Sequence, residues 1–325
     1  MIANEMATEE INMVSRMLTY HLENGGTIHT AFDTLRRDLP DNYENSISAL
    51  EKMVIGDESV QMVGYGYSFL GLLNEFVSLI KQEKGDIGQL FQSSQEVLRD
   101  AVTKARDYWS GFNALITYFA IILMIAIGVS AVFTIFVLPQ FQGMFESFGA
   151  PLPMFTAMVL NNNLLFTLII PVLTLLVVIC ALCSYHIRVR VSQFRPLSNI
   201  CRWVPGLNKM SDAYRYYLFV QYANILRKSD ISDESAIKHA ELMSGGNTNE
   251  QKFSIWRTAI ETAGQMNMLI PELEYQSVQV GALFGRHMIV VRERLTLWVQ
   301  VILGLLVGTL IIAMYLPIFK MGEVV

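Results

Sequence analysis

Three long stretches of this chain contain no Asp, Glu, Lys or Arg, and they constrain its fold more than any other feature. They are residues 114–138, 164–185 and 295–319. A helix rises about 1.5 Å per residue, so each stretch is long enough to cross a hydrocarbon core of about 30 Å. Buried core helices are the alternative, but uninterrupted apolar runs longer than ~18 residues favour membrane spans. The sequence therefore predicts three transmembrane helices.

The Lys and Arg residues around these stretches predict how the chain crosses the membrane. Positive charges precede the first span, follow the second and precede the third, whereas residues 139–163 contain no Lys or Arg. Positively charged flanks stay in the cytoplasm. We therefore expect residues 1–113 and 186–294 to be cytoplasmic, and residues 139–163 and 320–325 to lie on the outer side of the membrane.

The two cytoplasmic segments differ in charge. Residues 1–113 contain 9 Lys or Arg and 17 Asp or Glu, a net charge of −8, whereas residues 186–294 contain 14 and 10, a net charge of +4. Opposite fields steer association, so the two bodies can dock on each other or on different faces of a partner. Alternatively, the positive charge of the second body serves only to enforce the topology.

Both bodies are predicted to be helical and to be copies of one unit. Apolar residues recur at helical spacing, as in Phe69–Ile80 and Tyr216–Leu226, and strand-like alternation is scarce. Each body ends in a junction, Gly85–Leu90 or Gly264–Leu269, and 29 or 31 residues then lead from the junction glycine to a membrane span. Matching order and spacing predict an internal repeat. The expected fold class is therefore an all-α membrane protein with three transmembrane helices and two homologous helical-bundle cytoplasmic domains.

The most specific motif follows the first span and reads Pro139-Gln-Phe141-Gln-Gly-Met144-Phe145, followed by Gly149, Leu152-Pro153 and Thr156. Together with the Gly85–Leu90 junction and the ending around Pro317, it resembles the inner-membrane platform proteins of type IV pilus and type II secretion machines (the PilC/GspF family). The resemblance covers most of the chain from about Leu18 onward. The chain is short for the secretion branch and looks more like the compact platform proteins of type IVb pili.

We assign the motif residues a structural role. Pro139 is expected to end the first span and Pro317 the third, Gly25 is expected to stop a helix before a capping Thr27, and Gly85 and Gly88 are expected to serve a helix end that needs a positive φ. The residues of this structural set are Gly25, Gly85, Asp86, Gly88, Leu90, Pro139, Phe141, Met144, Phe145, Gly149, Leu152, Pro153, Thr156, Gly264 and Pro317. The second copy departs from the family pattern, with Ser229-Asp230 in place of a usual glycine, and with Gln265 and Asn267 in place of the acid and the second glycine of the junction.

The resemblance implies a function and a set of partners. It implies a multi-pass protein of the bacterial inner membrane, with the N-terminus in the cytoplasm and the C-terminus in the periplasm. It would couple a cytoplasmic hexameric assembly ATPase to the extraction of pilin or pseudopilin subunits from the bilayer, together with other inner-membrane assembly proteins and further copies of itself. A type II secretion platform and, less favoured, a small membrane transporter are the alternatives. We expect no nucleic-acid partner.

An enzyme is not expected. The five His residues are scattered, no phosphate-binding Gly-rich loop with a Lys is present, and no nucleophile and base converge in the sequence. Cys180 and Cys183 have the spacing of a metal or redox pair, but no second pair or His cluster completes a site, so they are interpreted as apolar helix residues. We therefore expect no catalytic residue, no metal and no cofactor.

Charged residues at the edges of the bodies are the candidates for partner binding, namely Asp86, Glu146, Arg227 and Lys228. Gly304 and Gly308 form a Gly-xxx-Gly pattern in the third span, which lets two helix backbones approach closely. The pattern is compatible with packing inside one chain and with a seam between two copies.

Overall fold

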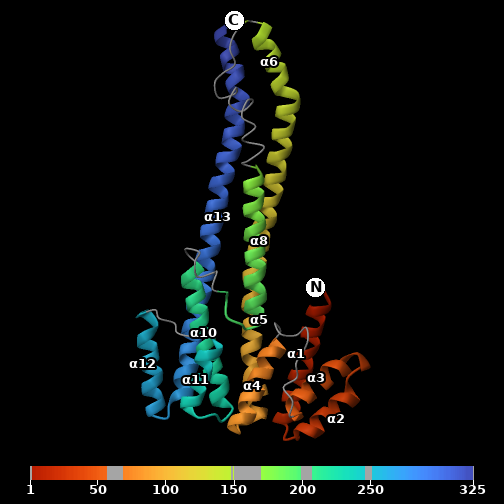
Figure 1. The fold of residues 1–325 in the computed structure, drawn as a ribbon, viewed down its shortest axis with the longest axis vertical. Helices are drawn as coiled ribbons and strands as arrows, with labels where there is room; N and C mark the ends of the chain where they lie inside the picture. Colours follow the sequence, from red (N-terminus) through yellow and green to blue (C-terminus); the bar gives the residue numbers. More distant parts are fainter. Residues whose placement is uncertain are drawn as a thin grey trace. The chain divides into compact units, whose positions relative to one another are not determined.

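The computed structural model describes residues 2–56, 69–147, 149, 170–198, 207–245 and 251–324, and all regular secondary structure in these residues is helical (Figure 1). The prediction of an all-α chain is thus confirmed. Contacts divide the chain into two compact units: unit 1 comprises Met1–Asp107 and Ile187–Met288, and unit 2 comprises Tyr108–His186 and Ile289–Val325.

The helices of unit 1 are α1 (Ile2–Glu23), α2 (Ile28–Asp38), the 3-10 turn η1 (Asp41–Tyr43), α3 (Glu44–Ile55), α4 (Phe69–Glu83), α10 (Leu207–Lys228), α11 (Asp233–Met243) and α12 (Gln251–Gln265). Three further helices, α5 (Ile87–Val132), α8 (Ile170–Ser192) and α13 (Leu269–Val324), contribute residues to both units. We call α1–α4 with the start of α5 the first repeat, and α10–α12 with the start of α13 the second repeat.

The first repeat buries one apolar stripe from each of its helices. The helices α1, α2 and α3 contact one another. Their buried residues include Val14 and Leu18 of α1, Phe32 and Leu35 of α2, and Leu50 of α3. These residues recur every three or four positions, so they lie on one face of each helix and cover one another.

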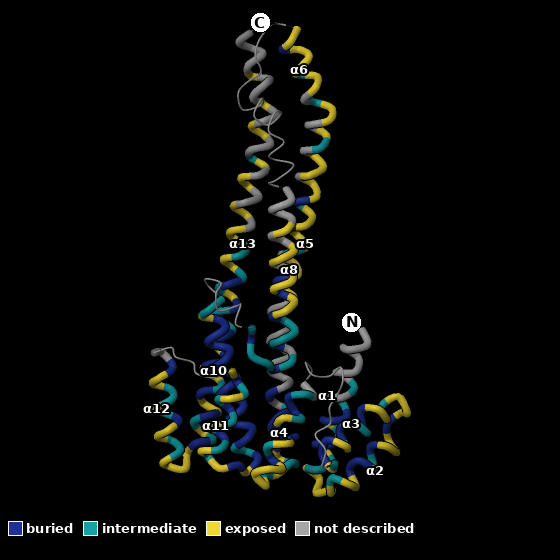
Figure 2. Tube along the Cα trace, viewed as in Figure 1, coloured by how far each residue is buried: buried dark blue, intermediate teal, exposed yellow. Residues whose placement is uncertain are grey.

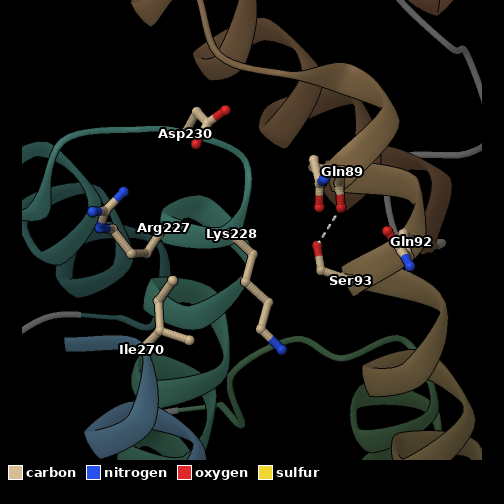
Figure 3. Close-up of a pocket in the computed structure, with 7 residues that line it drawn as sticks. All are labelled: Gln89, Gln92, Ser93, Arg227, Lys228, Asp230 and Ile270. Carbon is tan, nitrogen blue, oxygen red and sulfur yellow. Dashed lines mark hydrogen bonds between the residues drawn. The ribbon is translucent and has the colours of Figure 1, made fainter. Parts of the chain in front are cut away.

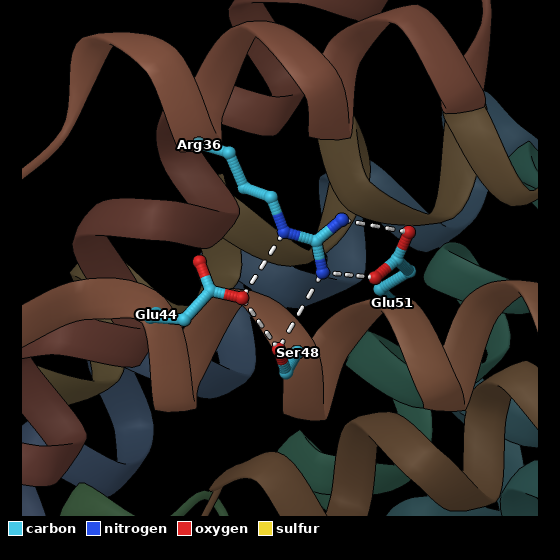
Figure 4. Close-up of polar contacts among 4 residues, drawn as sticks. All are labelled: Arg36, Glu44, Ser48 and Glu51. Atoms are coloured by element: carbon cyan, nitrogen blue, oxygen red, sulfur yellow. Dashed lines mark hydrogen bonds and ion pairs between the residues drawn. The ribbon is translucent and has the colours of Figure 1, made fainter. Parts of the chain in front are cut away.

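A cluster of charged side chains joins α2 to α3 on the surface (Figure 4). The Arg36 guanidinium contacts Glu44 Oε1 at 3.1 Å and Glu51 Oε2 at 2.5 Å, and Ser48 Oγ donates to Glu44 Oε1 at 2.9 Å. Hydrogen bonds from Ser48 and Arg36 lower the pKa of Glu44, and those to Glu51 and Glu44 raise the pKa of Arg36. Because the cluster is exposed to solvent, it contributes little to stability.

The second repeat is built around α10. Every residue of α10 from Met210 to Leu226 is buried, whereas α1 buries only one face. Aromatic contacts fix α10 within its repeat: the ring of Tyr216 stacks on Phe253 with centroids 4.6 Å apart, and Tyr214 meets Phe284 at 4.7 Å. Burial raises the pKa of both tyrosines.

The first turns of the two repeats match residue by residue, 205 positions apart. Gly25 N donates to Leu22 O as Asp230 N donates to Arg227 O, and both residues have a positive φ, 80° and 63°. Thr27 caps α2 and Ser232 caps α11 through the same side-chain contact, so the expected capping role of Thr27 is observed. The second copy thus places Asp230 where the first has a glycine.

The second turns, before α5 and α13, correct two expectations. The residues with positive φ are Lys84 (59°) and Asn267 (55°), so neither Gly85 nor Gly88 serves that purpose. Gly264 lies in the last turn of α12 and not at the junction, which is formed by residues 266–268. The sequence pattern placed the second junction a few residues early because no glycine marks its true position.

Both prolines expected to end a span lie inside helical structure. The π-helix η2 (Phe133–Val137) leads directly into α6 (Leu138–Ser147), where Pro139 is the second residue. The ring of a proline interferes with the carbonyl four residues earlier, here Ile135, and the wider π-turn lies at that point. Likewise α13 continues past Pro317 to Val324.

Within the described residues, one helical stretch, Ser110–Val129, is long and apolar enough to cross a membrane. It overlaps the first predicted span. Residues 295–319 of the third span lie within α13 and residues 170–185 of the second within α8, whereas residues 164–169 lie outside the described residues. The number of three spans stays a prediction.

Many residues in the unit 2 parts of α5, α8 and α13 are exposed (Figure 2), and large apolar residues are among them. Examples are Met124, Phe136, Leu182 and Leu305, each more than half exposed. A surface of this kind is the reverse of that of unit 1, where apolar side chains form the core, and it marks a membrane or a protein interaction site.

Candidate functional site

Two turns of unit 1, one from each repeat, meet at the boundary between the repeats. The Asp86 backbone N–H donates to the carbonyl of Ser229, with N and O 2.9 Å apart. A Cβ placed on Gly85 would lie closer than 3.0 Å to the same carbonyl oxygen. Gly85 is therefore required for the close approach of two backbones. This requirement cannot be read from the local sequence, because Ser229 lies far away along the chain.

The carboxylate of Asp86 caps α5. Its Oδ1 accepts hydrogen bonds from the backbone N–H groups of Gly88, at 2.7 Å, and Gln89, at 3.4 Å. Negative charge is favourable at a helix N-terminus, where the first N–H groups have no partner in the helix. A Cβ on Gly88 would lie 3.2 Å from this oxygen, so the glycine leaves room for the cap.

Arg227 and Lys228 end α10 on the other side of this boundary. Arg227 forms an ion pair with Asp233, and the Lys228 ammonium lies 2.6 Å from Glu274 Oε1 on α13. The structure thus brings three of the predicted partner-binding residues, Asp86, Arg227 and Lys228, to one boundary. Each of them already has a partner within the chain, so their charges also hold the adjoining turns in place.

A cavity of about 540 Å³ lies between the two turns (Figure 3). Its lining combines the apolar Ile270 with the polar residues Gln89, Gln92, Ser93, Arg227, Lys228 and Asp230, whose aliphatic parts also face the cavity. The amides, the hydroxyl and the charged groups can hydrogen-bond a bound segment. The lining residues come from α5, from α10 and the turn after it, and from α13, so whatever enters the cavity contacts the starts of both long helices.

Further contacts join the two repeats along α4. Arg195, which follows α8, pairs with Glu75 at 2.9 Å, and the ring of Phe76 meets that of Tyr222 edge-on at 5.4 Å. Burial raises the pKa of Tyr222, whose hydroxyl donates to the carbonyl of Phe194. The two predicted bodies therefore dock on each other through a largely buried face of α4.

The motif after the first span lies on and beyond α6. Met144 is exposed, Phe145 is buried and Gly149 adopts a positive φ of 65°. Glu146 is exposed and accepts a hydrogen bond from the Gln142 side chain at 3.2 Å. Phe141 is half-buried on α6. The remaining motif residues, Leu152, Pro153 and Thr156, lie outside the described residues.

The other structural candidates are spread over both units. Leu90 is buried in the first turn of α5. Gly304 and Gly308 lie on α13, where a Cβ on either would meet nothing within 4 Å. Both interpretations of the Gly-xxx-Gly pattern, packing inside one chain and a seam between two copies, stay predictions.

Sequence reasoning missed the partners that hold this site together. Asp233 and Glu274 neutralise the two basic residues, and Gln89, Gln92 and Ile270 line the cavity. Only Gln89 had a local signal, because it lies inside the recognised junction motif. Among the described residues, no group of three His, Cys, Asp or Glu side chains is placed to hold a metal ion.

Comparison with known proteins identifies relatives of the chain. The type 4 fimbrial assembly protein PilC of Pseudomonas putida is 28% identical over 236 residues, which are 64% of this chain and 58% of the relative. The type IV pilus assembly protein TapC of Aeromonas hydrophila is 24% identical over 266 residues, 72% of this chain and 60% of the relative. PilC of Pseudomonas aeruginosa is 27% identical over 261 residues, 71% and 69%.

The chain spans about 60% of the length of the first two relatives. No family model matches the chain, and no solved structure matches it. The matches extend over most of this chain and all three relatives carry the same assembly role in their names. The predicted family resemblance is thereby confirmed, and the chain is similar to the PilC and TapC type IV pilus assembly proteins.

Proposed function

We propose that the chain is the inner-membrane platform protein of a type IV pilus assembly machine, and that it couples a cytoplasmic hexameric ATPase to the extraction of pilin subunits from the bilayer. The course of α5 and α13 carries the proposal. Each begins at a repeat junction, at Ile87 or Leu269, and continues as one helix into an uncharged apolar stretch. A continuous helix transmits a displacement of its first turn along its whole length.

The apolar exterior of unit 2 and the distribution of charge support the membrane assignment. Outward-facing residues such as Met124 and Phe136 are stable in lipid and unfavourable in water. The Lys and Arg residues flanking the apolar stretches support a cytoplasmic N-terminus and a periplasmic C-terminus. On this basis α5, α8 and α13 provide the three spans.

Unit 1 is the part that we propose the ATPase engages. Its repeats are joined through Asp86 and Ser229 and through Phe76 and Tyr222, so that a force on either repeat reaches the starts of both long helices. On the periplasmic side, exposed Met144 and Glu146 on α6 are candidates for contact with pilin, pseudopilin or another inner-membrane assembly protein.

A proline in α5 tests whether the helix transmits work. Thr103→Pro removes one backbone hydrogen bond in the helix interior and costs about 3 kcal/mol locally, whereas Thr103→Ala at the same position preserves the helix. In a strain that lacks its own copy of the chain, we expect the alanine variant to restore surface pili and the proline variant to fail, with equal amounts of both in the membrane fraction. Normal piliation with Thr103→Pro would contradict the proposal.

The names of the relatives favour pilus assembly over type II secretion. A transporter is tested separately, since purified chain in liposomes should produce no flux of ions or small solutes. Flux that requires the chain would favour the transporter.

A further inference from the structure

Helices α4 and α12 occupy equivalent places in the two repeats, but their burial differs. Both have 15 residues, and both end in a turn whose residue of positive φ, Lys84 or Asn267, precedes a long helix. Aligning these two residues pairs Leu72 of α4 with Ile255 of α12. Leu72 is 1% exposed and Ile255 is 73% exposed.

The difference arises from what covers α4. In the first repeat, α4 is covered on one side by its own repeat and on the other by α10 and the turn after it. Phe76 meets Tyr222 of α10, and the turn after α4 receives the carbonyl of Ser229. The outer side of α12 has no such helix on it within the described residues, and Figure 2 colours α12 as exposed or intermediate along most of its length.

The uncovered side of α12 forms an apolar groove with the start of α13. The groove has a volume of about 450 Å³, and it is lined by Thr258, Ala259, Thr262, Ala263, Met266, Met268, Pro271 and Glu272. Met266 is 68% and Met268 59% exposed. Ile255 lies one turn earlier on the same face of α12. Methionine side chains adapt to the shape of a partner, and exposed apolar patches mark interaction sites.

We propose that this groove binds the first repeat of a second copy of the chain, in the way that the α4 face binds the second repeat within one chain. The covering residues Tyr222 and Ser229 have counterparts 205 positions earlier, Met17 and Asn24 at the end of α1. That end of α1 is accessible, with Asn24 exposed and the neighbouring Tyr20 55% exposed.

The contact joins two different surfaces of the chain. Within unit 1, α12 and the first-repeat helix α2 lie at opposite edges (Figure 1), so one copy offers its groove while the next offers its α1 end. Such a heterologous contact can close into a ring or continue from copy to copy. The opposite net charges of residues 1–113 and 186–294 favour this pairing over contacts between like repeats.

One residue makes the proposed contact looser than its counterpart inside the chain. Gly85 permits the close backbone approach in the first repeat, whereas the equivalent position in the second repeat carries Met268. A methionine side chain must therefore fill the space between the two copies. We therefore expect the contact between two copies to be reversible, whereas the contact between the two repeats of one chain is permanent.

Disulfide cross-linking tests which surfaces meet. In a chain with Cys180, Cys183 and Cys201 replaced by serine, Asn24→Cys and Met268→Cys are placed in two differently tagged copies and oxidised together in membranes. We expect a disulfide-linked dimer that carries both tags. The matched control pairs Asn24→Cys with Leu242→Cys, whose position is 68% exposed on α11 and outside the groove lining, and it should not cross-link.

Self-association of the purified chain in detergent gives a second measurement. Met266→Lys places a charge in the groove without disturbing a buried residue, and we expect the dissociation constant of the oligomer to rise by roughly tenfold or more. Leu242→Lys should leave it unchanged. Four outcomes would each overturn the proposal. In detergent, these are a monomeric chain and an oligomer that Met266→Lys does not weaken. In the cross-linking experiment, they are equal cross-linking of the control pair and a Met268→Cys copy that cross-links to itself or to another protein in place of Asn24→Cys. None of these readouts depends on pilus assembly.

Discussion

The two repeats share their turns but differ in what surrounds their helices. In the first, α1 is buried on one face; in the second, α10 is buried on every side, because it also covers α4 of the first repeat. The reverse holds at the other end, where α4 is covered and α12 is open. A duplicated unit thus keeps the local hydrogen bonds that end its helices, while one-way packing of the second copy on the first makes equivalent positions differ in burial.

The largest effect on stability is expected from a pair of matched side-chain truncations, one in each repeat. Leu72→Ala on α4 removes buried methyl groups and leaves a cavity, so we expect a loss of about 2–5 kcal/mol in unfolding free energy. Ile255→Ala at the equivalent exposed position of α12 should change it by less than about 0.5 kcal/mol. Chemical unfolding of the purified chain in detergent measures both. Equal losses would show that the two faces are equally buried in solution.

A side chain at Gly85 should separate the repeats. Gly85→Val forces a Cβ and two methyl groups against the carbonyl of Ser229, and we expect a destabilisation of about 1–3 kcal/mol in thermal unfolding. Gly285→Ala is the matched control, because a Cβ at this helical glycine meets nothing within 4 Å. The control should be neutral or slightly stabilising. A Gly85→Val chain as stable as the control would show that the two turns do not approach each other closely.

Replacing a turn residue of positive φ by glycine should make the chain more stable. Lys84 holds a positive φ of 59°, which costs a residue with a Cβ about 1–2 kcal/mol relative to glycine. We expect Lys84→Gly to raise the unfolding free energy by about 1 kcal/mol. Asp230→Gly should raise it by less, because Asp tolerates this conformation better than Lys. The comparison fails if Gly25→Ala, the reverse change in the first repeat, does not destabilise the chain.

The smallest effect is expected at the surface cluster of the first repeat, which is formed by Arg36, Glu44, Ser48 and Glu51. Since the pKa of Glu44 is lowered in the folded chain, its contribution is present above its unfolded pKa and is lost as the pH falls through the folded value. We therefore expect a small acid-side loss of stability below about pH 4.5, which Glu44→Gln abolishes. A pH titration of the unfolding midpoint compares the two chains.

Much of the local structure could be predicted because its causes are local. The apolar spacing of Phe69–Ile80 predicts α4, and Thr27 and the Gly85–Leu90 motif indicate where α2 and α5 begin. The candidate site was only partly predictable. Asp86, Arg227 and Lys228 were named as separate charges, whereas their meeting at one boundary and their partners Asp233 and Glu274 depend on contacts between residues far apart in the chain.

The wrong expectations have the same origin. Gly85 was assigned to a positive φ because glycine is common there, but the residue that adopts it is Lys84, and Gly85 instead admits Ser229. Pro139 is expected to end the first span, and a preceding π-turn lets helical structure continue past this proline. At both positions the local rule states which conformations and contacts a residue allows, and packing against the surrounding chain determines which of them occurs.

The sequence by itself determined that the chain is helical, that its apolar stretches are long enough for a membrane, that it contains a repeat, and that it resembles pilus assembly proteins. These conclusions depend on composition and on spacing along the chain. Only the tertiary structure decided that the two repeats dock on each other, that α10 is central and that α12 is left open. Burial of a helix face depends on which other helix reaches it, and that is set by packing between residues more than a hundred positions apart.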